Sequence, residues 1–299
     1  MLTENDEEIF KLIDNKAQEI QNIRQRPLLV MYYDDVACEI EHDDVRDLYD
    51  EIRERGASKE NKVTEKLDVL LHTYGGDPDA SYRLAQVIRD FNKDVCFLIP
   101  FHATSGGTLI CLCGNEIWLG AYATLGPIDI TIDSIEVASI DYFRLFATHC
   151  REMIEDLLKK RGLEEHRDTN VDSELLVEMV RQVKALDIGT LYRNSDLTGH
   201  YARKLMEDYM FANASNKKIL ARDIADKLLR GFPSHSFVMD FHICQDLQLP
   251  VKEMGEQLSD LTKDLVLEID RAAQRQIVCK ILGERHGRTY KAPFFRLYV

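Results

Sequence analysis

Two short segments of this sequence place a possible nucleophile and two pairs of glycines directly after apolar runs. Ser105 precedes one glycine pair and follows an apolar run of strand length. Gly75 and Gly76 follow an earlier run of the same kind. A serine among small residues at a strand-to-helix turn exposes its hydroxyl, and nearby backbone N–H groups can bind an oxyanion. The two segments therefore predict a serine hydrolase rather than a binding module.

Hydrolysis of an amide or ester needs a nucleophile, a base and an oxyanion stabiliser. The sequence predicts Ser105 as the nucleophile and the N–H of Gly106, which follows it, as one donor of the oxyanion hole. Gly76 is the expected second donor, because a side chain at either glycine would block the substrate backbone. The alternative for the earlier glycine pair is a tight turn with no role in chemistry.

The order of motifs along the chain resembles that of a known group of proteins. Five segments carry the resemblance: His-Thr-Tyr-Gly-Gly, Ala-Thr-Ser-Gly-Gly-Thr, Asn-Glu-Ile, Leu-Gly-Pro-Ile-Asp and Ser-His-Ser, at residues 72–76, 103–108, 115–117, 125–129 and 234–236. Together they resemble the serine dehydrogenase proteinase family, relatives of signal peptide peptidase A within the Clp protease/crotonase superfold. The resemblance covers roughly residues 65 to 250. Tyr74, Ile130 and Ser236 depart from the residues common in that family.

The resemblance implies an α/β fold, with a Clp protease/crotonase-like β/α core and a helical second half. The sequence pattern agrees, because buried-type strands alternate with helices up to about residue 130, as in parallel β/α architecture. We expect three parts: an N-terminal helix over residues 1–26, the serine hydrolase domain over 27–251, and a C-terminal helix with an aromatic tail over 252–299. Within the second half, the helices are expected at residues 140–160, 173–192, 197–211 and 219–229.

The general base is the least defined part of the predicted site. The resemblance implies His235, which corresponds to the histidine of a Thr-His-Asp-like segment, and Asp129 is expected to orient it. A triad is defined by its geometry and not by the order of its members in the chain. Asp129 serving a turn and His235 lying on a surface loop are the alternatives.

Other residues compete for the role of base. His72 and His102 lie beside the two glycine segments, and each is a candidate for the base or for substrate binding. Lys159 and Lys160 lie at a distance from Ser105 in the sequence that suits a Ser-Lys dyad, although cations at a helix end are ordinarily solvated.

Composition excludes several classes of partner. The net charge of −14 argues against nucleic acid and against adsorption to anionic membranes. No apolar stretch has the length of a membrane-spanning helix, and the acidic N-terminus lacks the pattern of a secretory signal. The seven cysteines show no metal-ligand spacing, so we expect reduced thiols, no metal, no cofactor and a cytoplasmic location.

The leading hypothesis is an ATP-independent cytosolic serine peptidase that cleaves peptides or unfolded segments. One alternative is a crotonase-like acyl-CoA hydrolase or isomerase, and another is a non-catalytic scaffold of the same fold. We also expect a homo-oligomer, a trimer or a multiple of it, with the C-terminal helix and residues 294–298 at subunit contacts. The alternative is that the C-terminal helix packs on its own domain.

Overall fold

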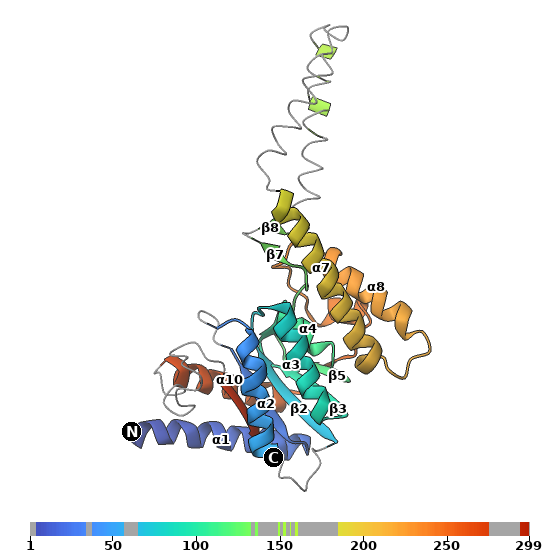
Figure 1. Cartoon of the computed structure of the whole chain (residues 1–299). Helices are drawn as coiled ribbons and strands as arrows, with labels where there is room; N and C mark the ends of the chain where they lie inside the picture. Colours follow the sequence, from blue (N-terminus) through green and yellow to red (C-terminus); the bar gives the residue numbers. More distant parts are fainter. Residues whose placement is uncertain are drawn as a thin grey trace.

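A six-stranded sheet forms the centre of the molecule in the computed structural model (Figure 1). The strand order is β10-β1-β2-β3-β5-β9, and all neighbouring pairs are parallel except β10 with β1. The strands are β1 (Leu28–Tyr32), β2 (Lys66–His72), β3 (Asp94–Ile99), β5 (Glu116–Leu119), β9 (Val251–Glu253) and β10 (Phe294–Tyr298). The structure describes residues 4–33, 38–56, 65–132, 135–136, 149, 152–153, 156, 159–160, 185–274 and 294–298.

Helices cover both faces of this sheet. Successive residues of a strand point to opposite faces, and in β1 Leu29 contributes to one hydrophobic core and Leu28 to another. The first core lies beneath α2 (His42–Gly56), α3 (Pro78–Phe91) and α4 (Gly106–Cys111), and the second beneath α1 (Glu4–Arg24) and α10 (Glu256–Gln274). Burial of both faces explains the continuous apolar runs of the strands. The predicted α/β core is confirmed.

The helical second half rests against α3, α4 and the loops at the carboxyl ends of the strands (Figure 1). It contains α7 (Ala185–Leu205), the π-helical segment η2 (Met206–Met210), α8 (Lys217–Arg230) and α9 (Phe241–Asp246). Two short parallel strands, β4 (His102–Ala103) and β6 (Thr124–Leu125), pair near the serine segment, and β7 (Thr131–Ile132) pairs with β8 (Ile135–Glu136).

One predicted helix boundary in this half is wrong. The expected break between residues 192 and 197 is absent, because α7 continues through it and into η2. Residues 193–196 are polar, but buried Leu191, Ser195 and Ala202 lie on one face of a continuous helix. Most of the helix predicted over residues 140–160, and most of the one over 173–192, lies outside the described residues.

The C-terminal elements pack within the chain itself. The aromatic tail forms β10, which pairs with β1 in the order Leu28 opposite Tyr298 to Tyr32 opposite Phe294. α10 packs against α1, where the Lys16 ammonium lies 2.9 Å from the Asp264 carboxylate. This packing matches the alternative in which the C-terminal helix folds onto its own domain. The predicted division of the chain at residues 26/27 and 251/252 stays a prediction.

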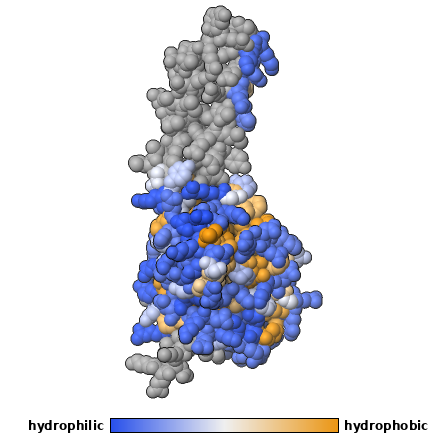
Figure 2. Space-filling view, turned by 90° about the vertical axis from the view of Figure 1, so that its right-hand side faces the viewer, coloured by the Kyte–Doolittle hydropathy of each residue, from blue (hydrophilic) through white to orange (hydrophobic). Residues whose placement is uncertain are grey.

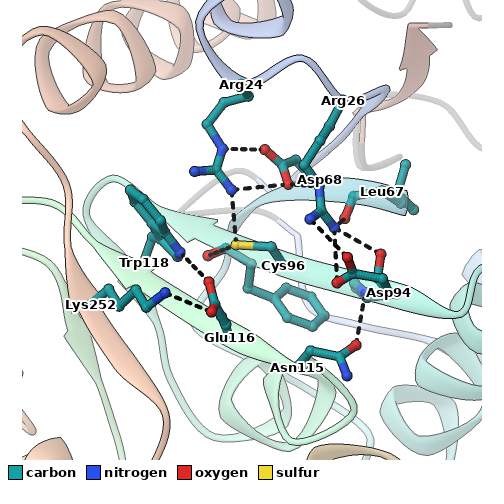
Figure 3. Close-up of polar contacts among 12 residues, drawn as sticks. Arg24, Arg26, Leu67, Asp68, Asp94, Cys96, Asn115, Glu116, Trp118 and Lys252 are labelled. Carbon is teal, nitrogen blue, oxygen red and sulfur yellow. Dashed lines mark hydrogen bonds and ion pairs between the residues drawn. The ribbon is translucent and has the colours of Figure 1, made fainter. Parts of the chain in front are cut away.

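A cluster of charged side chains joins the end of α1 to the sheet (Figure 3). The Asp68 carboxylate is almost fully buried and lies 2.6 Å from Nε of both Arg24 and Arg26. The Arg24 guanidinium also lies 4.1 Å from the ring centroid of Trp118, on β5. Burial disfavours the charged form of Glu116, but hydrogen bonds from Lys252 and Trp118 outweigh it and lower the pKa of Glu116. These contacts join the end of α1 to β2 and β5.

The surface is mixed in character. Figure 2 shows a face that is mostly hydrophilic, with hydrophobic residues gathered near its centre. None of the helices in the described part of the chain has the length and hydrophobicity that crossing a membrane requires. The five cysteines within the described residues are free and buried, as predicted: Cys38, Cys96, Cys111, Cys113 and Cys244.

Candidate active site

Ser105 occupies a strained turn between β4 and α4. Its backbone has φ 52° and ψ −118°, a region that residues other than glycine rarely adopt. Such strain persists only where the surrounding structure enforces it, and it concentrates at functional sites. A serine at a sharp strand-to-helix turn is also the arrangement by which many hydrolases expose a nucleophile. The geometry thus presents the Ser105 hydroxyl for chemistry.

The earlier glycine turn lies directly against Ser105. Gly75 and Gly76 follow β2 with φ of 112° and 148°, values that favour glycine. A Cβ atom added to Gly75 would lie 2.7 Å from Cβ of Ser105 and 2.8 Å from the backbone nitrogen of Gly106. Only glycine permits this approach, so the two segments that the sequence singled out form one site.

Helix α3 holds the glycine turn in place. Asp77 caps the helix, since its side chain accepts a hydrogen bond of 2.8 Å from the Ala80 N–H, and Pro78 follows at the first turn. On the other side, the Ile40 N–H donates to the Gly75 carbonyl and the Asp77 N–H donates to the Ile40 carbonyl, both at 2.9 Å. The turn is therefore fixed from both sides.

Two backbone N–H groups remain available beside Ser105. Within the described part of the chain, no acceptor contacts the N–H of Gly76 or that of Gly106, whereas the next N–H, of Gly107, donates to the Thr104 carbonyl at 2.8 Å. Gly106 is the first residue of α4, where N–H groups have no partner in the helix. The geometry offers these two groups to an oxyanion.

His235 and Asp129 lie together, although they come from distant loops. Nδ1 of His235 is 2.8 Å from Oδ1 of Asp129, which is 5% exposed. Paired backbone bonds between Leu125 and Met239, each of 3.0 Å, join the two loops. A proton on Nδ1 that is shared with this carboxylate leaves Nε2 as the hydrogen-bond acceptor. That is the form of histidine that can accept a proton from a serine.

A single open pocket connects these groups. Its volume is about 310 Å³, and it is lined by Glu39, Tyr74, Gly75, Gly76, Pro78, Ser105, Asp129, Ile130 and His235. The structure thus brings together Ser105, Asp129, His235 and Gly76, with Gly106 directly behind the serine. Glu39 and Pro78 are the lining residues that the sequence did not indicate. Glu39 belongs to no motif, and only the backbone pairing of Ile40 brings it here.

The other candidates for the base lie elsewhere. His72 is 4% exposed at the end of β2, with its ring 5.3 Å from Tyr32 and 4.2 Å from His102 between centroids. His102 stacks on Tyr74 at 4.0 Å. Neither histidine lines the pocket, and nor do Lys159 and Lys160, which are exposed helical residues. Substrate binding by His72 and His102 stays a prediction.

One group of side chains near the site has the spacing of metal ligands. His42, Asp77 and Asp79 each place one ligand atom within 4.8 Å of the others. Other contacts already account for both carboxylates. Asp77 caps α3, and Asp79 accepts a hydrogen bond of 2.6 Å from the Tyr201 hydroxyl, which raises the pKa of Tyr201 to about 12. The arrangement by itself does not call for a cation.

Comparison with known sequences points to one family. Residues 54–156 match the sequence model of the ClpP-like SDH-type serine proteinases. This range contains Gly76, Ser105 and Asp129, whereas His235 lies beyond it. The resemblance inferred from the motifs is thereby confirmed.

Curated relatives cover a smaller part of the chain. Two uncharacterized proteins of Methanocaldococcus jannaschii are 36% identical over 74 residues and 31% identical over 86 residues. The first alignment spans 25% of this chain and 25% of the relative, and the second spans 29% of each. The chain thus matches between a quarter and a third of the length of these relatives.

Among solved structures, the 1510-N membrane-bound stomatin-specific protease is similar in two forms. A mutant in complex with a substrate peptide is 12% identical, with 77% of this chain and 75% of that chain covered and a TM-score of 0.38. A second mutant is 18% identical, with 50% and 69% covered and a TM-score of 0.26. Scores this low add nothing to the family match.

Proposed function

We propose that this chain, a relative of the ClpP-like SDH-type serine proteinases through residues 54–156, cleaves peptides with Ser105 as its nucleophile. The observation that carries the proposal is the pocket in which Ser105, on its strained turn, meets the His235–Asp129 pair and the Gly75–Gly76 turn. A nucleophile and an oriented base in one pocket, with two backbone N–H donors beside the nucleophile, are the parts that acyl transfer needs.

In this mechanism, Nε2 of His235 accepts the proton of the Ser105 hydroxyl as Oγ attacks the carbonyl carbon of the substrate. The N–H groups of Gly76 and Gly106 stabilise the oxyanion, and Asp129 stabilises the imidazolium that forms. His235 then gives the proton to the leaving amine, which breaks the peptide bond and leaves an acyl-enzyme. Water, activated by the same histidine, hydrolyses the acyl-enzyme and restores Ser105.

The substrates that suit this site are short peptides or unfolded segments, because an extended chain can reach a serine in an open pocket. Independence of ATP and a cytosolic location belong to the same proposal. The acyl-CoA alternative gains no support from the pocket, since none of its described lining residues is Lys or Arg, and the phosphates of CoA need cations.

Labelling with a fluorophosphonate probe tests the nucleophile. We expect the probe to modify wild-type protein at Ser105, with no modification and no peptide hydrolysis in Ser105→Ala. Ser215→Ala is the control, because Ser215 is exposed, precedes α8 and does not line the pocket. Circular dichroism establishes that both variants fold. Wild-type hydrolysis by Ser105→Ala would reject the serine mechanism, and a folded protein that neither reacts nor hydrolyses would favour a scaffold.

A further inference from the structure

We infer that the pocket selects peptides that carry a lysine or arginine side chain close to the scissile bond, and that Glu39 is the residue that recognises it. The inference names a substrate class for the proposed peptidase, and so it rests on that function for cleavage, although binding can be measured without cleavage. The chemistry recognised is a cation at the end of an extended peptide side chain.

The backbone around Glu39 directs this side chain to the pocket. Cys38 and Ile40 on either side are 9% and 1% exposed, while Glu39 is exposed. In an extended segment, neighbouring side chains point to opposite sides. The two hydrogen bonds of Ile40 with Gly75 and Asp77 fix the segment beside the glycine turn. Glu39 is thus held at the mouth of the pocket, where it lines the same space as Ser105.

Two carboxylates are among the described residues that line the pocket, and that of Glu39 differs from that of Asp129 in its partners. The Asp129 carboxylate is hydrogen-bonded to His235. No ion pair or hydrogen bond engages the Glu39 carboxylate within the part of the chain that the structure describes. An exposed carboxylate carries negative charge at neutral pH. A bound cation would therefore gain a partner here without displacing one.

Neighbouring groups favour the same ligand. Tyr74, also in the lining, is 56% exposed and its ring is held against His102, so its orientation is fixed. Aromatic faces attract ammonium and guanidinium groups. Asp77 and Asp79 follow the glycine turn and add negative potential beside it. An acidic substrate side chain would be repelled by all of these carboxylates.

Matched peptides test the inference in two assays. The peptides have an acetylated N-terminus and differ at one position beside the scissile bond, which holds Lys, Gln or Glu. Fluorescence anisotropy measures their binding to Ser105→Ala, and kcat/KM measures their cleavage by wild type. We expect both the affinity and kcat/KM to be about tenfold higher for the Lys peptide than for the Glu peptide. Attraction of the Lys side chain and repulsion of the Glu side chain at an exposed carboxylate each contribute a few-fold. Higher salt should reduce this difference.

Substitution of Glu39 tests whether this residue causes the preference for the Lys peptide. Glu39→Gln should remove most of the preference for the Lys peptide over the Glu peptide, and Glu39→Lys should reverse that preference. Glu19→Gln is the control and should keep the preference, because Glu19 is exposed on α1 and outside the pocket. Equal binding and equal cleavage of the three peptides would overturn the inference, as would a Lys preference that survives in Glu39→Gln. A Gln peptide made with a free N-terminus serves as a further comparison: if it binds more tightly than the acetylated Lys peptide, the inference is overturned in favour of amino-terminal recognition.

The two proposals fail in different ways. If Ser105 does not react with the fluorophosphonate but the Lys peptide binds in a Glu39-dependent manner, peptidase activity is wrong and cation recognition stands. If Ser105 cleaves all three peptides at the same rate with equal binding, cation recognition is wrong and peptidase activity stands.

Discussion

At the scale of single residues, the proposed site contains a contact between His235 and Asp129, which are separated by 106 positions in the sequence. The Asp129 carboxylate is almost fully buried, so it presents a fixed acceptor to Nδ1 of the histidine. A buried acceptor of this kind sets both the ring orientation and the tautomer. The roles of the two side chains in the proposed mechanism therefore differ, and substitutions should separate them.

Substitution of the pair should lower turnover without unfolding the protein. We expect His235→Ala to reduce kcat roughly a hundredfold or more, the usual scale for a lost general base. Asp129→Asn should also reduce kcat, because an amide N–H facing Nδ1 favours the tautomer with its proton on Nε2, which cannot accept the serine proton. Steady-state kinetics on a peptide substrate measure both effects. Full activity of His235→Ala together with an inactive Lys160→Ala would favour the Ser-Lys alternative.

A second prediction at the scale of single residues concerns the stability of the Gly75–Gly76 turn. Gly75→Ala should destabilise the protein by about 1–3 kcal/mol, through its backbone conformation and the contact that its Cβ would make with Ser105. It should also abolish probe labelling, since Ser105 must move. Gly255→Ala is the control, because its Cβ would have no neighbour within 4 Å. Urea denaturation followed by circular dichroism gives the free energies of unfolding, and equal values for the two variants would contradict the account.

At the scale of elements, buried charge joins α1 to the sheet. Asp68 is 1% exposed; it accepts hydrogen bonds from Arg24, the last residue of α1, and forms an ion pair with Arg26. By contrast, the Lys16–Asp264 pair joins α1 to α10 at the surface, with the Asp264 side chain 55% exposed. Removing one member of a buried group leaves uncompensated charge, whereas an exposed pair contributes little. The two acids thus provide a matched comparison.

We expect Asp68→Ala to lower the free energy of unfolding by about 3–5 kcal/mol, because it removes the ion-pair partner of the largely buried Arg24 guanidinium, whereas Arg26 keeps its ion pair with Asp94. Asp264→Ala should lower it by less than about 1 kcal/mol. Urea unfolding curves for the two variants and wild type give the values. Similar small losses in both variants would show that solvent reaches Arg24 and Arg26 freely.

At the scale of the whole molecule, the aromatic tail has a defined place in the chain. Phe295 is 4% exposed, packs edge-on against Tyr33 at 5.7 Å between ring centroids, and belongs to β10 at the edge of the sheet. Exposed apolar side chains are present elsewhere, among them Ile219 and Val238 at 55% and 59% exposure. Grouped apolar side chains on a surface are typical of interaction sites. Homo-oligomer formation, as a trimer or a multiple of it, stays a prediction.

Phe295→Ala tests whether the aromatic tail contributes to the stability of the chain or to subunit contacts. We expect a loss of about 3–5 kcal/mol in the free energy of unfolding, as for a large aromatic side chain removed from a core. Light scattering at a temperature where the variant is folded should give the same mass as wild type. A changed mass with unchanged stability would place the tail at a subunit contact instead, and a monomeric wild type would end the oligomer prediction.

Local sequence patterns determined the parallel strands β1, β2, β3 and β5 of the central sheet and indicated half of the candidate site. Continuous apolar runs such as Leu67–Leu71 predict strands that are buried on both faces, because each residue must avoid water whichever way it points. Ser105 with its glycines and the earlier glycine turn follow two such strands. Parallel strands carry their carboxyl ends to one edge of the sheet, so adjacency of these segments followed from the pattern and the resemblance.

Only the tertiary structure decided the rest. The contact of His235 with Asp129 depends on how the helical half packs on the sheet, and the pairing of β10 with β1 joins residues from the two ends of the chain. The entry of Glu39 into the pocket depends on the backbone of Ile40 bonding to Gly75 and Asp77. Periodicity reports which face of an element avoids water, but it does not encode which distant element covers that face. That choice is made by the packing of the complete chain.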